Sequence, residues 1–178
     1  MGLQKILRGR GLRDFFSHDD FCRVAVSAVR VLFQIKQFAD TETSVTINNS
    51  EAIRGQAVSI VFKFSRPSIL SINDQVVRLL QVVKATMMLQ PRLINVELSY
   101  MPYARDEHEQ HTISMFGFCL QAMGVTVMSA VQLHDPSIIQ TFKIPLRNVT
   151  LEHVWAKVIK EQIIQRGSWC VASPDEGG

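Results

Sequence analysis

The chain has 178 residues, of which 47% are hydrophobic and 20% are charged, and this balance is typical of one globular domain. Nineteen Lys and Arg against sixteen Asp and Glu leave a formal charge of +3, which is too small to indicate a nucleic-acid-binding surface. The 3 cysteines have no CxxC spacing, which disfavours a disulfide framework and a cysteine zinc site, and no apolar run is long enough to span a bilayer. We therefore expect a soluble protein of a reducing compartment, cytoplasmic, with no membrane or nucleic-acid partner.

Residues 1–18 form a basic segment, because several cations precede the first acid, Asp14. These cations are Lys5, Arg8, Arg10 and Arg13. An Arg-rich, acid-poor start is typical of a mitochondrial transit peptide, but the stretch before Asp14 lacks the Ser that such peptides favour. A solvated basic arm is the simpler interpretation, and residues 19–178 are then the folded domain.

The first predicted elements are one helix and two strands. Apolar residues recur at helical spacing behind two acids over residues 19–33, which predicts a helix. Residues 43–47 alternate and are rich in β-branched side chains, and residues 57–64 (AVSIVFKF) have the character of a buried strand. Arg54-Gly55 supplies a turn between these two strands.

The remaining elements alternate between helices and strands. Ser71 and Asn73-Asp74 are typical helix caps, so we expect a helix from there to about Leu89, before Pro91. Strands are predicted at residues 93–98, 125–133 and 169–172, and helices at residues 112–123 and 151–164. Strands separated by helices of this length predict an α/β fold of three layers, in which a mostly parallel central sheet lies between helices.

Three loops at the ends of predicted strands carry most of the polar chemistry. They are residues 99–111 (SYMPYARDEHEQH), 132–148 (QLHDPSIIQTFKIPLRN) and 173–178 (SPDEGG). In parallel α/β sheets, ligands bind at the carboxyl ends of the strands. We therefore expect the functional residues in these loops.

Five segments, in order along the chain, carry a family resemblance. Residues 38–61 (FADTETSVTINNSEAIRGQAVSIV) resemble an F-x-[DN]-x-E stretch followed by a strand and an Arg-Gly turn, and residues 72–80 (INDQVVRLL) resemble a helix that opens with Ile-Asn-Asp. Residues 102–105 (PYAR) are similar to Pro-Tyr-Ala-Arg-Gln-Asp. Residues 133–148 resemble Leu-His-Ala-x-Gln-Ile-Gln-Gly-Phe-Phe-Asp-Ile-Pro-Val-Asp-Asn, and residues 173–178 resemble Ser-Pro-Asp-x-Gly-Gly. The family with these motifs is ribose-phosphate pyrophosphokinase, also called phosphoribosyl pyrophosphate synthetase.

The resemblance implies a phosphoribosyltransferase-like fold and, in complete relatives, transfer of the β,γ-diphosphate of MgATP to the 1-hydroxyl of ribose 5-phosphate. It implies that Phe38, Asp40 and Glu42 hold adenine across a subunit interface, and that the loop of Arg105 and Asp106 meets the phosphates of ATP. These residue types suit those roles, because an aromatic face stacks on a base, carboxylates accept from its amine, and a guanidinium binds phosphate oxygens. Mg²⁺ is the implied cofactor, and ATP and further subunits are the implied partners.

The sequence departs from the family where the family places acids. Gln132, Lys143 and Arg147 stand at positions where the family has Asp. Mg²⁺ prefers carboxylate and water oxygens, and nearby cations would repel it. His134 and Asp135 remain as candidate metal contacts, although His134 is better explained as a structural histidine at a strand end, because its anionic partners are missing. In the Arg105 loop, the acid Asp106 replaces a family Gln and disfavours a triphosphate.

Complete relatives continue through a second domain, which we expect to be absent from this chain. Two functions then fit the sequence. The first is a synthetase-like protein of nucleotide biosynthesis that is inactive as this chain alone. The alternative is a non-catalytic homologue that assembles with itself or with a complete synthetase as a structural or regulatory subunit.

Overall fold

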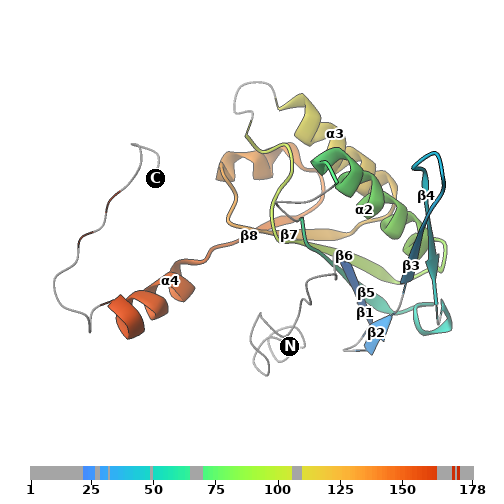
Figure 1. The fold of residues 1–178 in the computed structure, drawn as a ribbon, viewed down its shortest axis with the longest axis horizontal. Helices are drawn as coiled ribbons and strands as arrows, with labels where there is room; N and C mark the ends of the chain where they lie inside the picture. Colours follow the sequence, from blue (N-terminus) through green and yellow to red (C-terminus); the bar gives the residue numbers. More distant parts are fainter. Residues whose placement is uncertain are drawn as a thin grey trace.

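The computed structural model describes residues 22–26, 29–31, 33–48, 50–64, 70–105, 110–163, 170 and 172. Its centre is a 6-stranded sheet with the order β2-β1-β5-β6-β7-β8, shown in Figure 1. The strands are β1 (Cys22–Val26), β2 (Val29–Val31), β5 (Ala57–Phe62), β6 (Leu93–Leu98), β7 (Val127–Val131) and β8 (Leu146–Val149). Strands β5 to β8 pair in parallel, and β1 and β2 are antiparallel additions at one edge. The predicted α/β class with a mostly parallel sheet is confirmed.

The predicted helix over residues 19–33 is wrong, because the described part of this segment is extended. It contains β1, β2 and the first residue of β3 (Phe33–Gln37). Strand β1 pairs antiparallel with β5, so that Val24 lies opposite Ile60. The segment is rich in valine, which loses side-chain freedom in a helix and fits a pleated sheet. Long-range pairing with β5 therefore overrides the helical spacing.

A separate hairpin follows, formed by β3 and β4 (Thr43–Ile47). The prediction of a strand at residues 43–47 is confirmed, but its partner is β3 and not the next strand, β5. Between β4 and β5 lie a short 3-10 helix, η2 (Ser50–Ala52), and the predicted turn at Gly55. Gly55 has φ +70°, a left-handed conformation that side-chain-bearing residues rarely adopt.

Helix α2 (Ile72–Met87) begins where the sequence predicts it. The Ser71 hydroxyl accepts a hydrogen bond from the Asp74 backbone N–H at 3.1 Å, and the Asp74 carboxylate accepts one from the Ser71 backbone N–H at 2.9 Å. This reciprocal pair is a capping box, which satisfies two amides that a helix start leaves unpaired. The apolar face of α2, including Val76, Leu79 and Val83, is buried against the sheet.

Helices α2 and α3 (His111–Ala122) lie on the same face of the sheet, as Figure 1 shows. This face carries the alternate buried residues of the strands, such as Val58, Ile60 and Phe62 of β5. The opposite face carries half-buried residues, and no helix of the described ranges packs on it as the expected third layer would. Glu97 of β6 is on this opposite face, where burial raises the pKa of its carboxyl.

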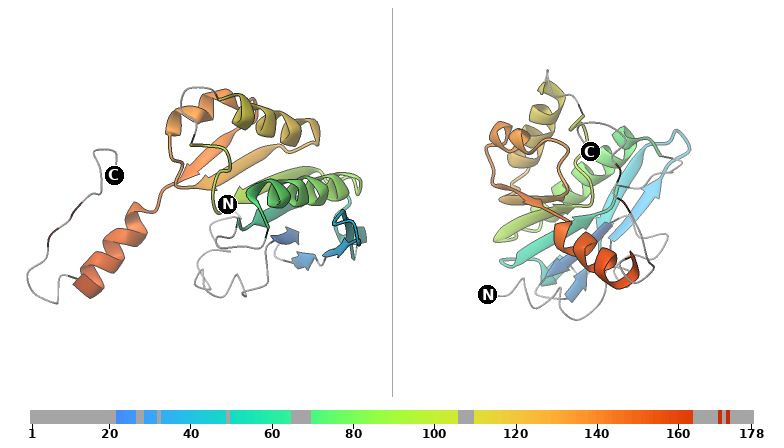
Figure 2. Two further views of the ribbon diagram at one scale, coloured as in Figure 1. Left: turned by 45° about the horizontal axis from the view of Figure 1, so that its top comes forward. Right: turned by 90° about the vertical axis from the view of Figure 1, so that its left-hand side faces the viewer.

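The elements after β7 agree only in part with the sequence prediction. Strand β8 was not predicted, because four residues between a proline and a helix give little periodic signal. The predicted helix at residues 151–164 is confirmed as α4 (Glu152–Val158), which continues as a π-helix, η4 (Ile159–Ile163). It extends away from the sheet (Figure 2). The predicted strand at residues 169–172 lies largely outside the described residues. No helix in the described ranges has the length and apolar character that crossing a membrane requires.

Candidate functional site

The turn of the β3–β4 hairpin carries the three residues that the resemblance assigns to adenine. The Phe38 N–H donates to the Glu42 carbonyl at 2.8 Å, and the Thr41 N–H donates to the Phe38 carbonyl at 3.0 Å. Asp40 accepts from the Glu42 N–H at 3.2 Å, and Thr41 has φ +74°. The turn is therefore held by its own backbone and by one aspartate, and it does not depend on a ligand for its shape.

The side chains at this turn are accessible. The Phe38 ring is 44% exposed, and Asp40 and Glu42 are exposed beside it. The Lys36 ammonium lies 4.8 Å from the centre of the Phe38 ring, a cation–π arrangement. One aromatic ring and two carboxylates are thus presented together at the tip of the hairpin, as the resemblance implies.

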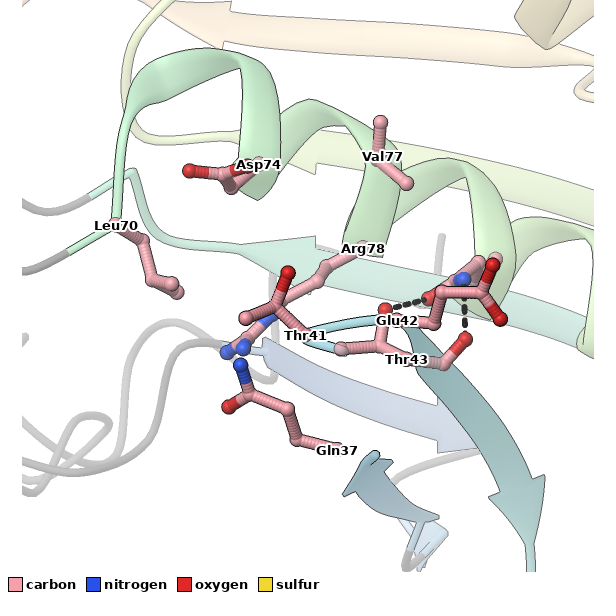
Figure 3. A pocket seen from close by; sticks show the side chains of 9 residues that line it. Gln37, Thr41, Glu42, Thr43, Leu70, Asp74, Val77 and Arg78 are labelled. Carbon is pink, nitrogen blue, oxygen red and sulfur yellow. Dashed lines mark hydrogen bonds between the residues drawn. The ribbon is translucent and has the colours of Figure 1, made fainter. Parts of the chain in front are cut away.

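Between this turn and α2 lies a hollow of about 620 Å³, which we call the hairpin hollow (Figure 3). Its polar lining comes from Gln37, Thr41 and Glu42 of the hairpin and from Asp74, Arg78 and Gln81 of α2. Its apolar lining includes Val77 of the helix.

Gln81 clamps the hairpin to α2. Its side-chain amide donates to the Thr43 carbonyl at 2.7 Å, and the Thr43 hydroxyl donates back to the Gln81 amide oxygen at 2.8 Å. This pair, dashed in Figure 3, joins residues that are 38 positions apart in the chain. No sequence motif assigns a binding role to Arg78 or Gln81. Their spacing from Asp74 nevertheless places all three on one helical face, which is a signal that the sequence contains.

Arg105 lies at a different place, in the loop after β6. Met101, Pro102 and Ala104 are buried and anchor this loop, whereas Arg105 is exposed. The Tyr103 hydroxyl donates to the Asn73 side-chain oxygen at 2.8 Å, which ties the loop to the start of α2, and burial raises the Tyr103 pKa. Asp106 lies outside the described residues.

The structure does not bring all predicted nucleotide residues into one cavity. The hairpin hollow contains Glu42, but Arg105 is not part of its lining. Phe38 and Asp40 lie on the exposed tip, also outside that lining. Within this one chain, the hairpin turn and the loop that carries Arg105 lie apart, on two separate surfaces (Figure 1).

The resemblance places a metal within residues 132–148, which run from the end of β7 into β8 and which we call the β7–β8 region. His134 is exposed. Asp135 is the N-cap of a 3-10 helix, η3 (Pro136–Thr141), and accepts from the Ser137 backbone N–H at 2.8 Å and from the Ser137 hydroxyl. These hydrogen bonds from Ser137, with a smaller contribution from His134, lower the pKa of Asp135. The one carboxylate here is already committed to a helix cap.

The other polar residues of this region are also engaged in holding the chain together. The Gln132 side-chain oxygen accepts from the Leu151 N–H at 3.2 Å, and the Asn148 side-chain oxygen accepts from the Leu133 N–H at 3.1 Å. Lys143 and Arg147 are exposed cations. They do not lie at the end of β7, because β8 pairs in parallel with β7 and Arg147 is opposite Ser129. In the described part of the chain, no three His, Cys, Asp or Glu residues gather as a metal site would require. The residues at this end of the sheet therefore do not fit Mg²⁺, which prefers several carboxylate oxygens.

Comparison with known proteins supports the resemblance. The family model of the N-terminal domain of ribose phosphate pyrophosphokinase matches residues 24–124. Among curated relatives, the ribose-phosphate pyrophosphokinase of Mycoplasmopsis pulmonis is 31% identical over 146 residues, covering 79% of this chain and 43% of the relative. That of Gloeobacter violaceus is 34% identical over 148 residues, covering 80% of this chain and 42% of the relative. The chain thus spans less than half the length of these relatives.

A solved structure has the same fold. The phosphoribosylpyrophosphate synthetase from Mycobacterium smegmatis superposes with a TM-score of 0.67 at 19% sequence identity, covering 79% of this chain and 47% of that one. At this identity the likeness concerns the fold. Since the family model matches more than half of the residues, the chain belongs to the family of ribose-phosphate pyrophosphokinase N-terminal domains.

Proposed function

We propose that this chain is the nucleotide-side domain of a ribose-phosphate pyrophosphokinase assembly, and that it does not catalyse diphosphoryl transfer by itself. In the family reaction, the β,γ-diphosphate of ATP is transferred to ribose 5-phosphate. The observation that carries the proposal is the hairpin turn, which presents Phe38, Asp40 and Glu42 on an exposed and internally held tip. An aromatic face flanked by carboxylates suits a purine with an exocyclic amine.

The separation of the hairpin from Arg105 supports a site shared between chains. An adenine edge on one copy and a phosphate-binding arginine on another would complete a nucleotide site that one copy leaves open. Apolar residues on the outer surface of the helices also support assembly. Met115 and Phe118 lie one turn apart on α3, and Phe118 is 66% exposed.

The second candidate function is a non-catalytic, regulatory subunit of the same assembly. It is favoured by the β7–β8 region, where Asp135 is committed to a cap. Lys143 and Arg147 also stand at two positions where the family has Asp. In this version the chain would supply its hairpin to a complete synthetase and contribute no chemistry of its own. In both versions Mg²⁺ at this end of the sheet is not required for nucleotide binding.

Calorimetry with ATP tests the nucleotide site directly. We expect weak binding that changes little when magnesium is omitted, and that falls about tenfold with Phe38→Ala or Arg105→Ala, since each removes one stacking or charge-assisted contact. Arg92→Ala, at another exposed arginine, is the matched control. Binding that requires magnesium, or that neither variant weakens, would contradict the proposed site.

Activity and assembly separate the two versions. The purified chain should release no AMP from ATP and ribose 5-phosphate, and it should sediment as a dimer or a larger particle. If the chain is a regulatory subunit, adding it to a complete synthetase should give a mixed complex with altered activity. A strict monomer at high micromolar concentration that does not join a synthetase would contradict both versions.

A further inference from the structure

The hairpin hollow contains an arginine that the fold does not use. Arg78 is half buried in α2 and lines the hollow, yet within the described part of the chain its guanidinium has no hydrogen-bond or ion-pair partner. In Figure 3 the Arg78 side chain reaches from the helix toward Thr41 and Gln37 of the hairpin. A guanidinium offers several N–H donors in a planar fork that matches carboxylate and phosphate oxygens.

The nearest acids make no ion pair with this guanidinium in the described structure. Hydrogen bonds from Ser71 lower the pKa of Asp74, and the charge of Arg78 makes only a small contribution to that lowering. The Asp74 carboxylate accepts from the Ser71 backbone N–H at 2.9 Å and from the Ser71 hydroxyl at 2.7 Å, so it is committed to the cap of α2. The Glu42 carboxylate lies on the far side of Thr43 from the Arg78 guanidinium and points away from it (Figure 3). Arg78 therefore faces a space of about 620 Å³ without a direct acceptor.

We propose that the hairpin hollow binds a small ligand through a single carboxylate or phosphate group. Arg78 provides the charge-assisted hydrogen bonds, and the Gln37 amide and the Thr41 hydroxyl provide further donors on the hairpin side. The two-way hydrogen bond between Gln81 and Thr43 holds both walls in place before the ligand arrives. The volume lies within the range of about 300–1,000 Å³ that is usual for small-molecule sites.

The charge of the lining limits the ligand class. The lining contains one guanidinium, Arg78, and two carboxylates, Glu42 and Asp74, so a polyanion such as a triphosphate would be repelled. A ligand with one anionic group and several hydrogen-bond donors fits better, because its donors can meet Glu42. This site shares Glu42 with the adenine edge proposed above, but it does not include Phe38, Asp40 or Arg105. Variants at those three positions therefore distinguish the two sites.

Titration of the isotopically labelled chain with inorganic phosphate, and separately with acetate, tests the site by NMR at constant ionic strength. The expected result is a saturable shift of the Arg78 Nε–H signal and of the Thr41 amide with at least one anion. Comparison of the two midpoints tells whether phosphate or carboxylate is preferred. Absence of a saturable shift with both anions would overturn the proposal.

Variants make the test specific. Arg78→Gln should weaken anion binding by at least about tenfold, because it removes the positive charge and the paired N–H donors of the guanidinium. Glu42→Gln should tighten anion binding about threefold, because it removes a negative charge that repels the anion. Lys84→Gln, the same charge change on an exposed part of α2, should leave the midpoint unchanged. An equal loss with Lys84→Gln, or unchanged binding in Arg78→Gln, would overturn the assignment.

A further variant separates this site from the proposed nucleotide site. Phe38→Ala should leave the anion titration unchanged while weakening ATP. If the chain does not bind ATP but the anion titration gives the expected shifts, the proposed nucleotide function is wrong, while the anion site in the hairpin hollow is supported. If Phe38→Ala abolishes the anion shifts, the hollow is not an independent site.

Discussion

The hairpin region and the β7–β8 region differ in how they use their polar side chains, although in both an aspartate accepts a hydrogen bond from a nearby backbone amide. At the hairpin turn, the Phe38 ring and the Glu42 carboxylate are exposed, and Arg78 beneath them has no direct partner in the described structure. At the β7–β8 end, Gln132 and Asn148 accept hydrogen bonds from backbone amides. A side chain that satisfies a backbone amide is not free to bind a ligand without cost. Ligand binding is therefore expected at the hairpin.

The largest test of this difference is to restore the acids at the β7–β8 end. The triple variant Gln132→Asp, Lys143→Asp and Arg147→Asp lowers the local formal charge by one unit at the first position and by two at each of the others. We expect affinity for Mn²⁺, used as a paramagnetic substitute for Mg²⁺, to rise at least about a hundredfold. Electron paramagnetic resonance measures free Mn²⁺ directly. Unchanged affinity would show that the region is excluded from metal binding by its shape and not by its charges.

The second test concerns the packing that supports the β7–β8 region. A Cβ at Gly117 of α3 would lie 2.7 Å from ring carbons of Phe142, which precedes β8. Gly117→Ala should therefore lower the free energy of unfolding by about 1–3 kcal/mol, the usual cost of overpacking. Urea denaturation measures the change. The double variant with Phe142→Leu should recover part of the loss if this contact is the cause.

The third test removes the clamp of the hairpin region. Gln81→Leu deletes both hydrogen bonds to Thr43 and should cost about 1 kcal/mol of stability. Hydrogen exchange should become faster at the hairpin amides while the central strands stay protected. Equal acceleration in β5 and β6 would mean that the hairpin is an integral part of the global fold and not a locally clamped element.

The smallest expected effect comes from Glu97, on the sheet face opposite α2 and α3. Burial raises the pKa of its carboxyl, although hydrogen bonds from Ser59 and Asn95 act in the other direction. A raised pKa means that the folded state holds this proton more tightly than the unfolded state, so Glu97 reduces stability as the pH rises above its unfolded pKa. Glu97→Gln should therefore be more stable than the natural chain at pH 7, with the gain disappearing toward acid pH. Thermal unfolding across pH shows the sign, and a constant difference at all pH values would contradict it.

Local chemistry made much of the fold predictable. The capping residues Ser71 and Asp74 marked the start of α2, and the apolar runs of β5 and β6 marked buried strands, because caps and periodicity depend on neighbours in sequence. The segment at residues 19–33 was predicted incorrectly for the opposite reason. Its apolar spacing is typical of a helix, but it forms a strand because it pairs with β5.

Some features of the candidate site likewise follow from local sequence, and others depend on tertiary packing. The sequence by itself determined the family, the motif of Phe38, Asp40 and Glu42, and the loss of acids at Gln132, Lys143 and Arg147, because these are matters of residue identity and order. Only the tertiary structure decided that Arg105 and the hairpin form separate surfaces. It alone placed Arg78 opposite the hairpin, through a clamp that joins positions 38 residues apart. Such contacts depend on how distant segments pack, and no local pattern in the sequence encodes them.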